Sequence, residues 1–227
     1  MDAEVFRTLD FFNDATGWIS GRIVEAQTDG GIFRLSLCGG STPAPIYSAL
    51  AEREDIDWNR VLLTFGDERT VGPEDEQSNY RMVKKSLIDP AGIPLSNVVR
   101  ICGELDPAAA AERCEGQLRK LAQLAGEDCF VHDLVLLGMG DDGHTASLFP
   151  ATAALNESKR WVVENFVPKF DAHRITFTYP LIAAAKEVAF LVNGAAKHPM
   201  AERVLSGDPA LPASSIEAGQ VFWFIGE

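Results

Sequence analysis

The chain has 227 residues, of which 46% are hydrophobic and 23% are charged, a composition typical of a globular protein with a sizeable core. Its 33 acidic and 20 basic residues give a formal net charge of -13. This charge argues against nucleic acid or an anionic membrane as a partner, because both require clustered Lys and Arg. It is compatible with a small anionic ligand, which a few local cations and backbone N–H groups can bind.

The cysteines are Cys38, Cys102, Cys114 and Cys129, and they contain no Cys-x-x-Cys pair. Because no histidine cluster accompanies them, we expect reduced thiols, no metal site and a cytoplasmic protein. Met1 to Asp10 lacks the apolar stretch of a signal peptide, and no apolar run is long enough to span a membrane. The oligomeric state stays open between a monomer and a small homo-oligomer.

Apolar periodicity predicts strands and helices that alternate along the chain. The expected strands cover 32–37, 61–65, 98–101, 134–137, 161–167, 174–178, 188–192 and 221–225. The expected helices cover 3–28, 44–53, 78–88, 106–125 and 197–205, with a short helical turn over 145–149. This alternation predicts a single α/β domain over 1–227, with a doubly wound, mostly parallel sheet flanked by helices, as in Rossmann-like folds. The region 173–192 is expected to add an antiparallel piece.

A glycine-rich loop, Gly39-Gly40-Ser41-Thr42-Pro43, joins the first predicted strand to the next helix. Glycines free backbone N–H groups, the Ser41 and Thr42 hydroxyls can donate, and a helix N-terminus adds partial positive charge. These features favour a phosphate-binding loop, although a Ser/Thr helix cap without a ligand has the same pattern. The loop matches neither the Walker A motif nor Gly-x-Gly-x-x-Gly, so we expect no nucleotide.

Three adjacent charged residues, Asp67, Glu68 and Arg69, follow the second buried strand. Their functional interpretation is an arginine that binds an anionic group and is oriented by the acids. A solvated turn is the structural alternative. The polar segment 70–79 that follows has a composition that would permit it to close over a ligand.

The third motif follows 134–137, an unbroken apolar run typical of a strand buried in a parallel sheet. Residues 138–144 read Gly-Met-Gly-Asp-Asp-Gly-His. Since ligands bind at the carboxyl ends of such strands, His144 is a candidate general base that Asp142 would hold in one tautomer. A tight turn with a solvated histidine is the alternative interpretation.

In this order and approximate spacing, the three motifs closely resemble those of the 6-phosphogluconolactonases, and the resemblance spans nearly the whole chain. Arg174-Ile175-Thr176 and the terminal Val221-Phe222-Trp223-Phe224 are also similar to that family. The related glucosamine-6-phosphate deaminases share the Gly-Gly-x-Thr-Pro and Gly-x-Asp-Gly-His motifs, but their histidine is followed by Ile-Ala-Phe-Asn-Glu-Pro. Here Thr-Ala-Ser-Leu-Phe-Pro follows His144, and Arg69 replaces a tyrosine. Both differences favour the lactonase.

The resemblance implies a sugar-phosphate isomerase-like fold and hydrolysis of 6-phospho-D-glucono-1,5-lactone to 6-phosphogluconate, in the oxidative pentose phosphate pathway, without metal or cofactor. His144 would take a proton from water, and Asp142 would orient His144 and stabilise its protonated form. Backbone N–H groups over 138–143 are candidates for the oxyanion site. The residues expected to contact this small anionic substrate are Gly39, Gly40, Ser41, Thr42, Asp67, Arg69, Gly140, Gly143, Lys169, Arg174 and Lys197. Which of the cations binds the phosphate stays open.

Two other classes of function remain. One is a phosphosugar isomerase or deaminase, and the other is a non-catalytic sugar-phosphate-binding regulator. The regulator ranks last because His144 and Asp142 are both present. A serine nucleophile is not expected, because neither Ser41 nor Ser147 lies in a Gly-x-Ser-x-Gly motif.

Overall fold

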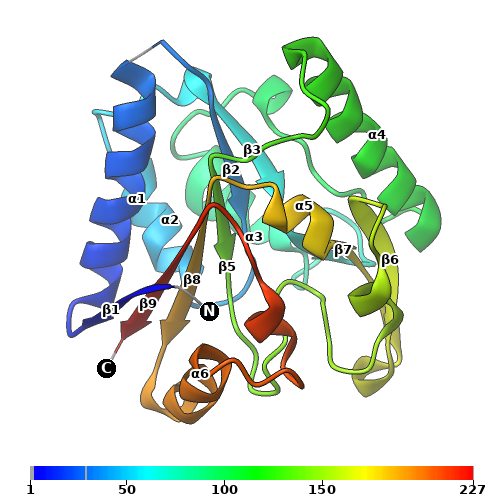
Figure 1. The fold of residues 1–227 in the computed structure, drawn as a ribbon. Helices are drawn as coiled ribbons and strands as arrows, with labels where there is room; N and C mark the ends of the chain where they lie inside the picture. The colour runs from blue at the N-terminus through cyan, green and yellow to red at the C-terminus, as the bar shows by residue number, and fades with distance from the viewer. Residues whose placement is uncertain (1–2, 29, 227) are drawn as a thin grey trace.

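The structure, a computed structural model, describes residues 3–28 and 30–226. Its centre is a six-stranded sheet in which every pair of neighbours is parallel, in the order β1-β9-β8-β5-β2-β3 (Figure 1). These strands are β1 (Glu4–Thr8), β2 (Phe33–Leu37), β3 (Val61–Phe65), β5 (Leu134–Leu137), β8 (Glu187–Asn193) and β9 (Gln220–Gly226). The sheet confirms the predicted doubly wound, mostly parallel architecture.

Strand β5 lies in the middle of this sheet, where Leu134 pairs with Leu35 of β2 and Val135 with Val188 of β8. All of its residues are buried, as expected for a parallel strand that is covered on both faces. From β2 the chain moves outward to β3, whereas from β5 it moves the other way to β8 and β9. The strand order therefore reverses between β2 and β5, the place where open α/β sheets bind ligands.

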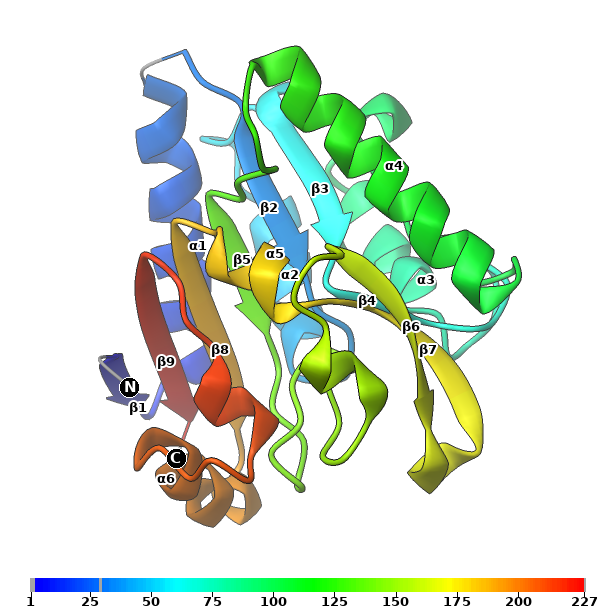
Figure 2. The same cartoon turned by 45° about the vertical axis from the view of Figure 1, so that its right-hand side comes forward.

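Helices cover both faces of the sheet. Helix α1 packs against α2 on one side, whereas α4 lies on the other side over a second, smaller sheet (Figures 1 and 2). The helices are α1 (Phe11–Thr28), α2 (Pro43–Ala51), α3 (Asn79–Val83) with a π-helical turn (Lys84–Ile88), α4 (Pro107–Ala125), α5 (Tyr179–Ala183) and α6 (His198–Leu205). Short 3₁₀ turns cover Trp58–Arg60, Leu95–Asn97, Ala153–Asn156, Pro168–Phe170, Ala195–Lys197 and Pro212–Ser215. Within the described ranges, none of these helices combines the length and apolar composition of a membrane span.

The predicted antiparallel piece exists, but it has other members than expected. The small sheet has the order β4-β7-β6, from β4 (Asp67–Arg69), β7 (Ala172–Phe177) and β6 (Val162–Val167). Strand β8 belongs instead to the parallel sheet, where it pairs with β5 and β9. Its interior residues are buried. The charged segment 67–69, for which no strand was predicted, pairs with β7 so that Arg69 lies opposite Arg174.

Three predictions of local structure were wrong. The region 3–28 is not one helix, because β1 precedes α1 and pairs with β9 at the other end of the chain. The segment 98–101 forms only one bridge, between Val98 and Leu63. The segment 145–149 forms a turn and no helix, because the φ of Ala146, 47°, lies in the left-handed region.

Candidate active site

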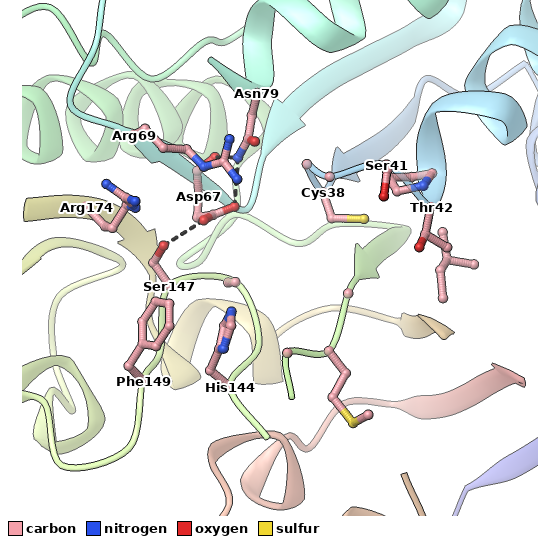
Figure 3. A pocket seen from close by; sticks show the side chains of 18 of the residues that line it. Cys38, Ser41, Thr42, Asp67, Arg69, Asn79, His144, Ser147, Phe149 and Arg174 are labelled. Carbon is pink, nitrogen blue, oxygen red and sulfur yellow. Dashed lines mark hydrogen bonds between the residues drawn. The ribbon is translucent and has the colours of Figure 1, made fainter. Parts of the chain in front are cut away.

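A cavity of about 350 Å³ opens at the carboxyl ends of β2, β5 and β8, beside the small sheet (Figure 3). It brings together the three sequence motifs. The predicted residues that line it are Gly39, Gly40, Ser41, Thr42, Asp67, Arg69, Gly140, His144, Arg174 and Lys197. Three predicted residues, Asp142, Gly143 and Lys169, are not part of its lining. The lining residues absent from the prediction include Asn79, Phe149 and Phe170.

The histidine and the aspartate of the third motif form a close pair. The Nδ1 atom of His144 lies 2.5 Å from Oδ1 of Asp142, and the Phe149 ring stacks on the imidazole with a centroid distance of 3.9 Å. Burial raises the pKa of Asp142, but hydrogen bonds from Lys169 and His144 outweigh it and lower that pKa to about 2. A carboxylate that stays ionised near neutral pH can fix the tautomer of His144, which leaves Nε2 to act as a base.

Gly140 and Gly143 shape the loop that carries His144. The N–H of Gly140 donates to the His144 carbonyl at 2.9 Å, and the N–H of Gly143 donates to the Gly140 carbonyl at 3.0 Å. These two N–H groups are therefore used within the loop, which corrects their predicted availability to an oxyanion. A Cβ atom on Gly140 would lie 2.0 Å from Cε1 of His144, so the ring can occupy its place only above a glycine.

Substitution of Gly140 by alanine is expected to lower turnover of the lactone expected from the sequence about 10²-fold, because the methyl group would displace the His144 ring from its position beside Asp142. The φ of Gly140 is not positive, so this clash is the main cost of the change. Steady-state kinetics of Gly140→Ala would be compared with Gly116→Ala, an exposed position in α4 where nothing lies within 4 Å. Full activity of Gly140→Ala would show that catalysis does not need the ring in this position.

The glycine-rich loop between β2 and α2 is fixed by Tyr47. The buried Tyr47 hydroxyl accepts the N–H of Cys38 and donates to its carbonyl, both at 3.0 Å. Thr42 stands at the N-cap of α2 without a side-chain cap hydrogen bond, so its hydroxyl is not committed to capping. Burial raises the pKa of the Cys38 thiol to about 12, and a thiol that stays protonated is no nucleophile.

Two arginines face the cavity from neighbouring strands of the small sheet (Figure 3). Arg69 and Arg174 are cross-strand partners, and among the described residues neither makes an ion pair with a carboxylate. Burial, followed by the charge of Arg69, lowers the pKa of Arg174. Like charges directly opposite each other are destabilising, so this pair is suited to an anion that contacts both guanidinium groups.

The buried Glu68 fixes the start of the 70–79 segment and its end. Only 2% of Glu68 is exposed, and burial raises the pKa of its carboxyl. The carboxylate accepts hydrogen bonds from the backbone N–H groups of Arg69, Asn79 and Tyr80 and from the Ser78 hydroxyl. These contacts hold both ends of the segment at the cavity, which leaves little freedom for a closing motion of the whole segment.

Asp67 links the small sheet to the loop that carries His144. Its Oδ2 accepts the Ser147 hydroxyl at 2.6 Å, and its Oδ1 accepts Nδ2 of Asn79 at 3.0 Å. Ser147 is 1% exposed. Its hydroxyl is therefore held toward the Asp67 carboxylate.

The two predicted lysines occupy different places. Lys197 lies just before α6 and donates from Nζ to the Met139 carbonyl at 2.7 Å, at the wall of the cavity. Lys169 donates instead to Oδ2 of Asp142 at 2.9 Å and does not line the cavity. Within residues 3–28 and 30–226, no group of three His, Cys, Asp or Glu side chains is arranged to hold a metal ion.

A histidine held by a carboxylate, across a cavity from paired arginines, is the arrangement expected of an enzyme that moves protons on a small anionic substrate. The model of the family "Glucosamine-6-phosphate isomerases/6-phosphogluconolactonase" matches residues 9–223. The chain belongs to this family.

Four similar proteins illustrate the likeness, and each is a 6-phosphogluconolactonase. The one from Nostoc sp. is 39% identical over 201 residues, which is 86% of this chain and 82% of that protein. The one from Synechocystis sp. is 36% identical over 214 residues, which is 92% and 88% of the two chains. The crystal structure of 6-phosphogluconolactonase from Thermotoga maritima superposes with a TM-score of 0.89 and 28% identity over 100% of both chains. The enzyme from Leishmania guyanensis does so with a TM-score of 0.84 and 30% identity, over 100% of this chain and 97% of that one.

Proposed function

We propose that this chain hydrolyses 6-phospho-D-glucono-1,5-lactone to 6-phosphogluconate in the pentose phosphate pathway. The observation that carries the proposal is the position of the His144–Asp142 pair in the same cavity as Arg69 and Arg174. Hydrolysis of a phosphorylated lactone requires a base that activates water and cationic groups that bind the phosphate. The family and its lactonase relatives support the same reaction, and the deaminase alternative is not favoured.

In the proposed mechanism, Nε2 of His144 takes a proton from water as the oxygen of that water attacks the lactone carbonyl carbon. Asp142 stabilises the imidazolium that forms. Positive charge in the cavity stabilises the tetrahedral oxyanion. The ring C–O bond then breaks, and His144 returns its proton to the departing ring oxygen, which gives the open-chain acid. A lactone is an activated ester, so the proposed chemistry needs neither a covalent intermediate nor a cofactor.

Substrate contacts are proposed along both sides of the cavity. Arg69 and Arg174 together hold an anionic part of the substrate, and the Gly39–Thr42 loop offers uncommitted hydroxyls at the N-terminus of α2. Lys197 adds a cation near the loop of the general base. Asp67 and Gly140 line the same space. This arrangement places donors at opposite walls, as expected for a sugar whose phosphate and lactone ends are both recognised.

The same proposal includes one domain over 1–227, a cytoplasmic location and a monomer or small homo-oligomer. The family match over 9–223 supports the single domain. The free thiols of all four cysteines support a reducing compartment.

Hydrolysis of the lactone tests the proposed function directly. 6-Phosphogluconolactone would be generated in situ, and formation of 6-phosphogluconate above the spontaneous rate would be followed, with glucosamine 6-phosphate in a parallel assay. We expect acceleration of lactone hydrolysis and no release of ammonia. Ammonia release without a lactone effect would identify a deaminase, and binding of phosphosugar without either reaction would identify a regulator.

Replacement of Arg174 by methionine is expected to lower kcat/KM for the phosphorylated lactone about 10- to 10²-fold, because a charge-assisted hydrogen bond contributes roughly 1.5–3 kcal/mol. The melting temperature should stay the same or rise, since the change removes like-charge repulsion from Arg69. Kinetics with phosphorylated and unphosphorylated gluconolactone would show whether the lost contact is to the phosphate. Arg53→Met is the control, since Arg53 pairs with Asp55 on the surface. Lower stability of Arg174→Met with unchanged kinetics would make Arg174 a structural residue.

A further inference from the structure

The carboxylate of Asp142 is shared between two nitrogen atoms, one from His144 and one from Lys169, and this sharing bears on the proposed hydrolysis, on which the following inference rests. Its Oδ1 atom contacts Nδ1 of His144 at 2.5 Å, and its Oδ2 atom accepts a hydrogen bond from Nζ of Lys169 at 2.9 Å. Lys169 comes from a different element, the turn Pro168–Phe170 between β6 and β7. One acid therefore connects the general base to the tip of the small sheet.

The same turn also supports His144 through aromatic rings. The Phe170 ring packs edge-on against Phe149, with a centroid distance of 5.7 Å and an interplanar angle of 83°. Phe149 stacks in turn on the imidazole of His144. The turn closes at Asp171, whose φ of 46° lies in the left-handed region. Two adjacent residues of this turn thus support His144 indirectly: Lys169 through the Asp142 carboxylate and Phe170 through the Phe149 ring.

We propose that Lys169 is a positioning residue that holds the Asp142 carboxylate against His144 and offsets part of its charge, and so sets the pH range in which His144 works. A carboxylate alone favours the imidazolium form of its histidine partner. An ammonium group on the other oxygen opposes this effect, because it repels a second positive charge nearby. Loss of the Lys169 ammonium group should therefore move the acidic limb of the activity profile to higher pH.

The remaining charges around His144 do not change when Lys169 is replaced. The titratable groups that share its cavity are Cys38, Asp67, Arg69, Arg174 and Lys197. Outside the cavity, Asp142 and Asp141 lie on the same loop as His144, and the charges of both act on Lys169. The side chain of Lys169 is 54% exposed, so solvent and salt weaken its effect. The expected shift is consequently a fraction of a pH unit rather than several units.

The test is the pH dependence of kcat/KM for lactone hydrolysis by Lys169→Met. We expect its acidic limb to move to higher pH by about half a unit, with little change in KM on the plateau. Lys169→Arg keeps the charge and should restore the position of the limb. Lys186→Met is the matched control, because Lys186 makes a similar exposed pair with Asp133 at 2.7 Å and does not line the cavity. Its profile should coincide with that of the unaltered protein.

Two outcomes would overturn the inference while the proposed function stands. An acidic limb that stays in place while KM rises tenfold or more would show that Lys169 contacts the substrate. A limb and a KM that both stay unchanged would make the contact with Asp142 an ordinary surface ion pair. A different result, no lactone hydrolysis by the unaltered protein, would remove the proposed function itself and this role with it.

Discussion

Replacement of His144 by alanine is expected to lower kcat for lactone hydrolysis by ~10²–10⁴-fold, the usual contribution of a general base. The residue lies at the cavity, between the Asp142 carboxylate and the Phe149 ring. Its side chain is only partly buried, with 23% exposed, so removal should leave the fold intact. KM should change little, because the base acts on water rather than on the ground-state substrate.

The matched control for this substitution is His173→Ala. His173 lies on β7 and its side chain is 43% exposed, but it does not line the cavity. Both variants would be assayed after their melting temperatures had been measured. Turnover near that of the unaltered protein for a folded His144→Ala would remove His144 from the role of base, and the other cavity residues would then have to supply it.

The free energy of unfolding is expected to fall as the pH decreases from about 6.5 toward 3. The cause is His132, a buried histidine that does not line the cavity. His132 is 0% exposed and lies between the rings of Phe130 and Phe177. Burial, together with the charge of Arg34, lowers its pKa from 6.5 to about 3. Over this range His132 binds a proton in the unfolded chain but stays neutral in the folded protein. The stability present above pH 6.5 is therefore lost progressively on acidification.

The size of this effect follows from the pKa difference. Each pKa unit corresponds to about 1.4 kcal/mol, so His132 should account for roughly 4 kcal/mol between pH 6.5 and 3. Urea unfolding of the unaltered protein and of His132→Gln at pH 7.5, 6.0 and 5.0 would measure the part lost by pH 5.0, roughly 2 kcal/mol. Glutamine does not titrate and can keep the hydrogen bond to Thr64, which lies 2.9 Å from Nε2. Identical pH slopes for the two proteins would contradict the prediction.

The interior of the fold was predictable because its signals are local. Strand β5 is an unbroken apolar run, and the helix α4 begins with the cap Asp106 and ends at Gly126, with a φ of 74°. Strand β1 lacked such a signal. It is an edge strand with mostly exposed or half-buried residues, and only its pairing with β9 at the opposite end of the chain defines it.

The candidate site could be predicted in part for the same reason. Gly140 and His144 stand in one short motif, so their proximity follows from sequence alone. Asn79 and Phe149 also belong to the sequence motifs, but their contribution to the cavity depends on packing between distant segments. The sequence predicted Lys169 as a further cation that could bind the substrate phosphate. Only the register of the β6–β7 hairpin directs its ammonium group to Asp142.

The hydrogen bond between Ser147 and Asp67 joins segments 80 residues apart in the chain. Because His144 belongs to the loop after β5 and Arg69 and Arg174 belong to the small sheet, neither sheet holds all of these cavity residues by itself. Contacts of such long sequence separation close large loops, which costs conformational entropy and slows folding. The six-stranded sheet needs even longer contacts, such as the pairing of Glu4 with Phe222 between β1 and β9. The proposed activity is then a property of the docked sheets, and its return after denaturation would report that both sheets and the contact between them have formed.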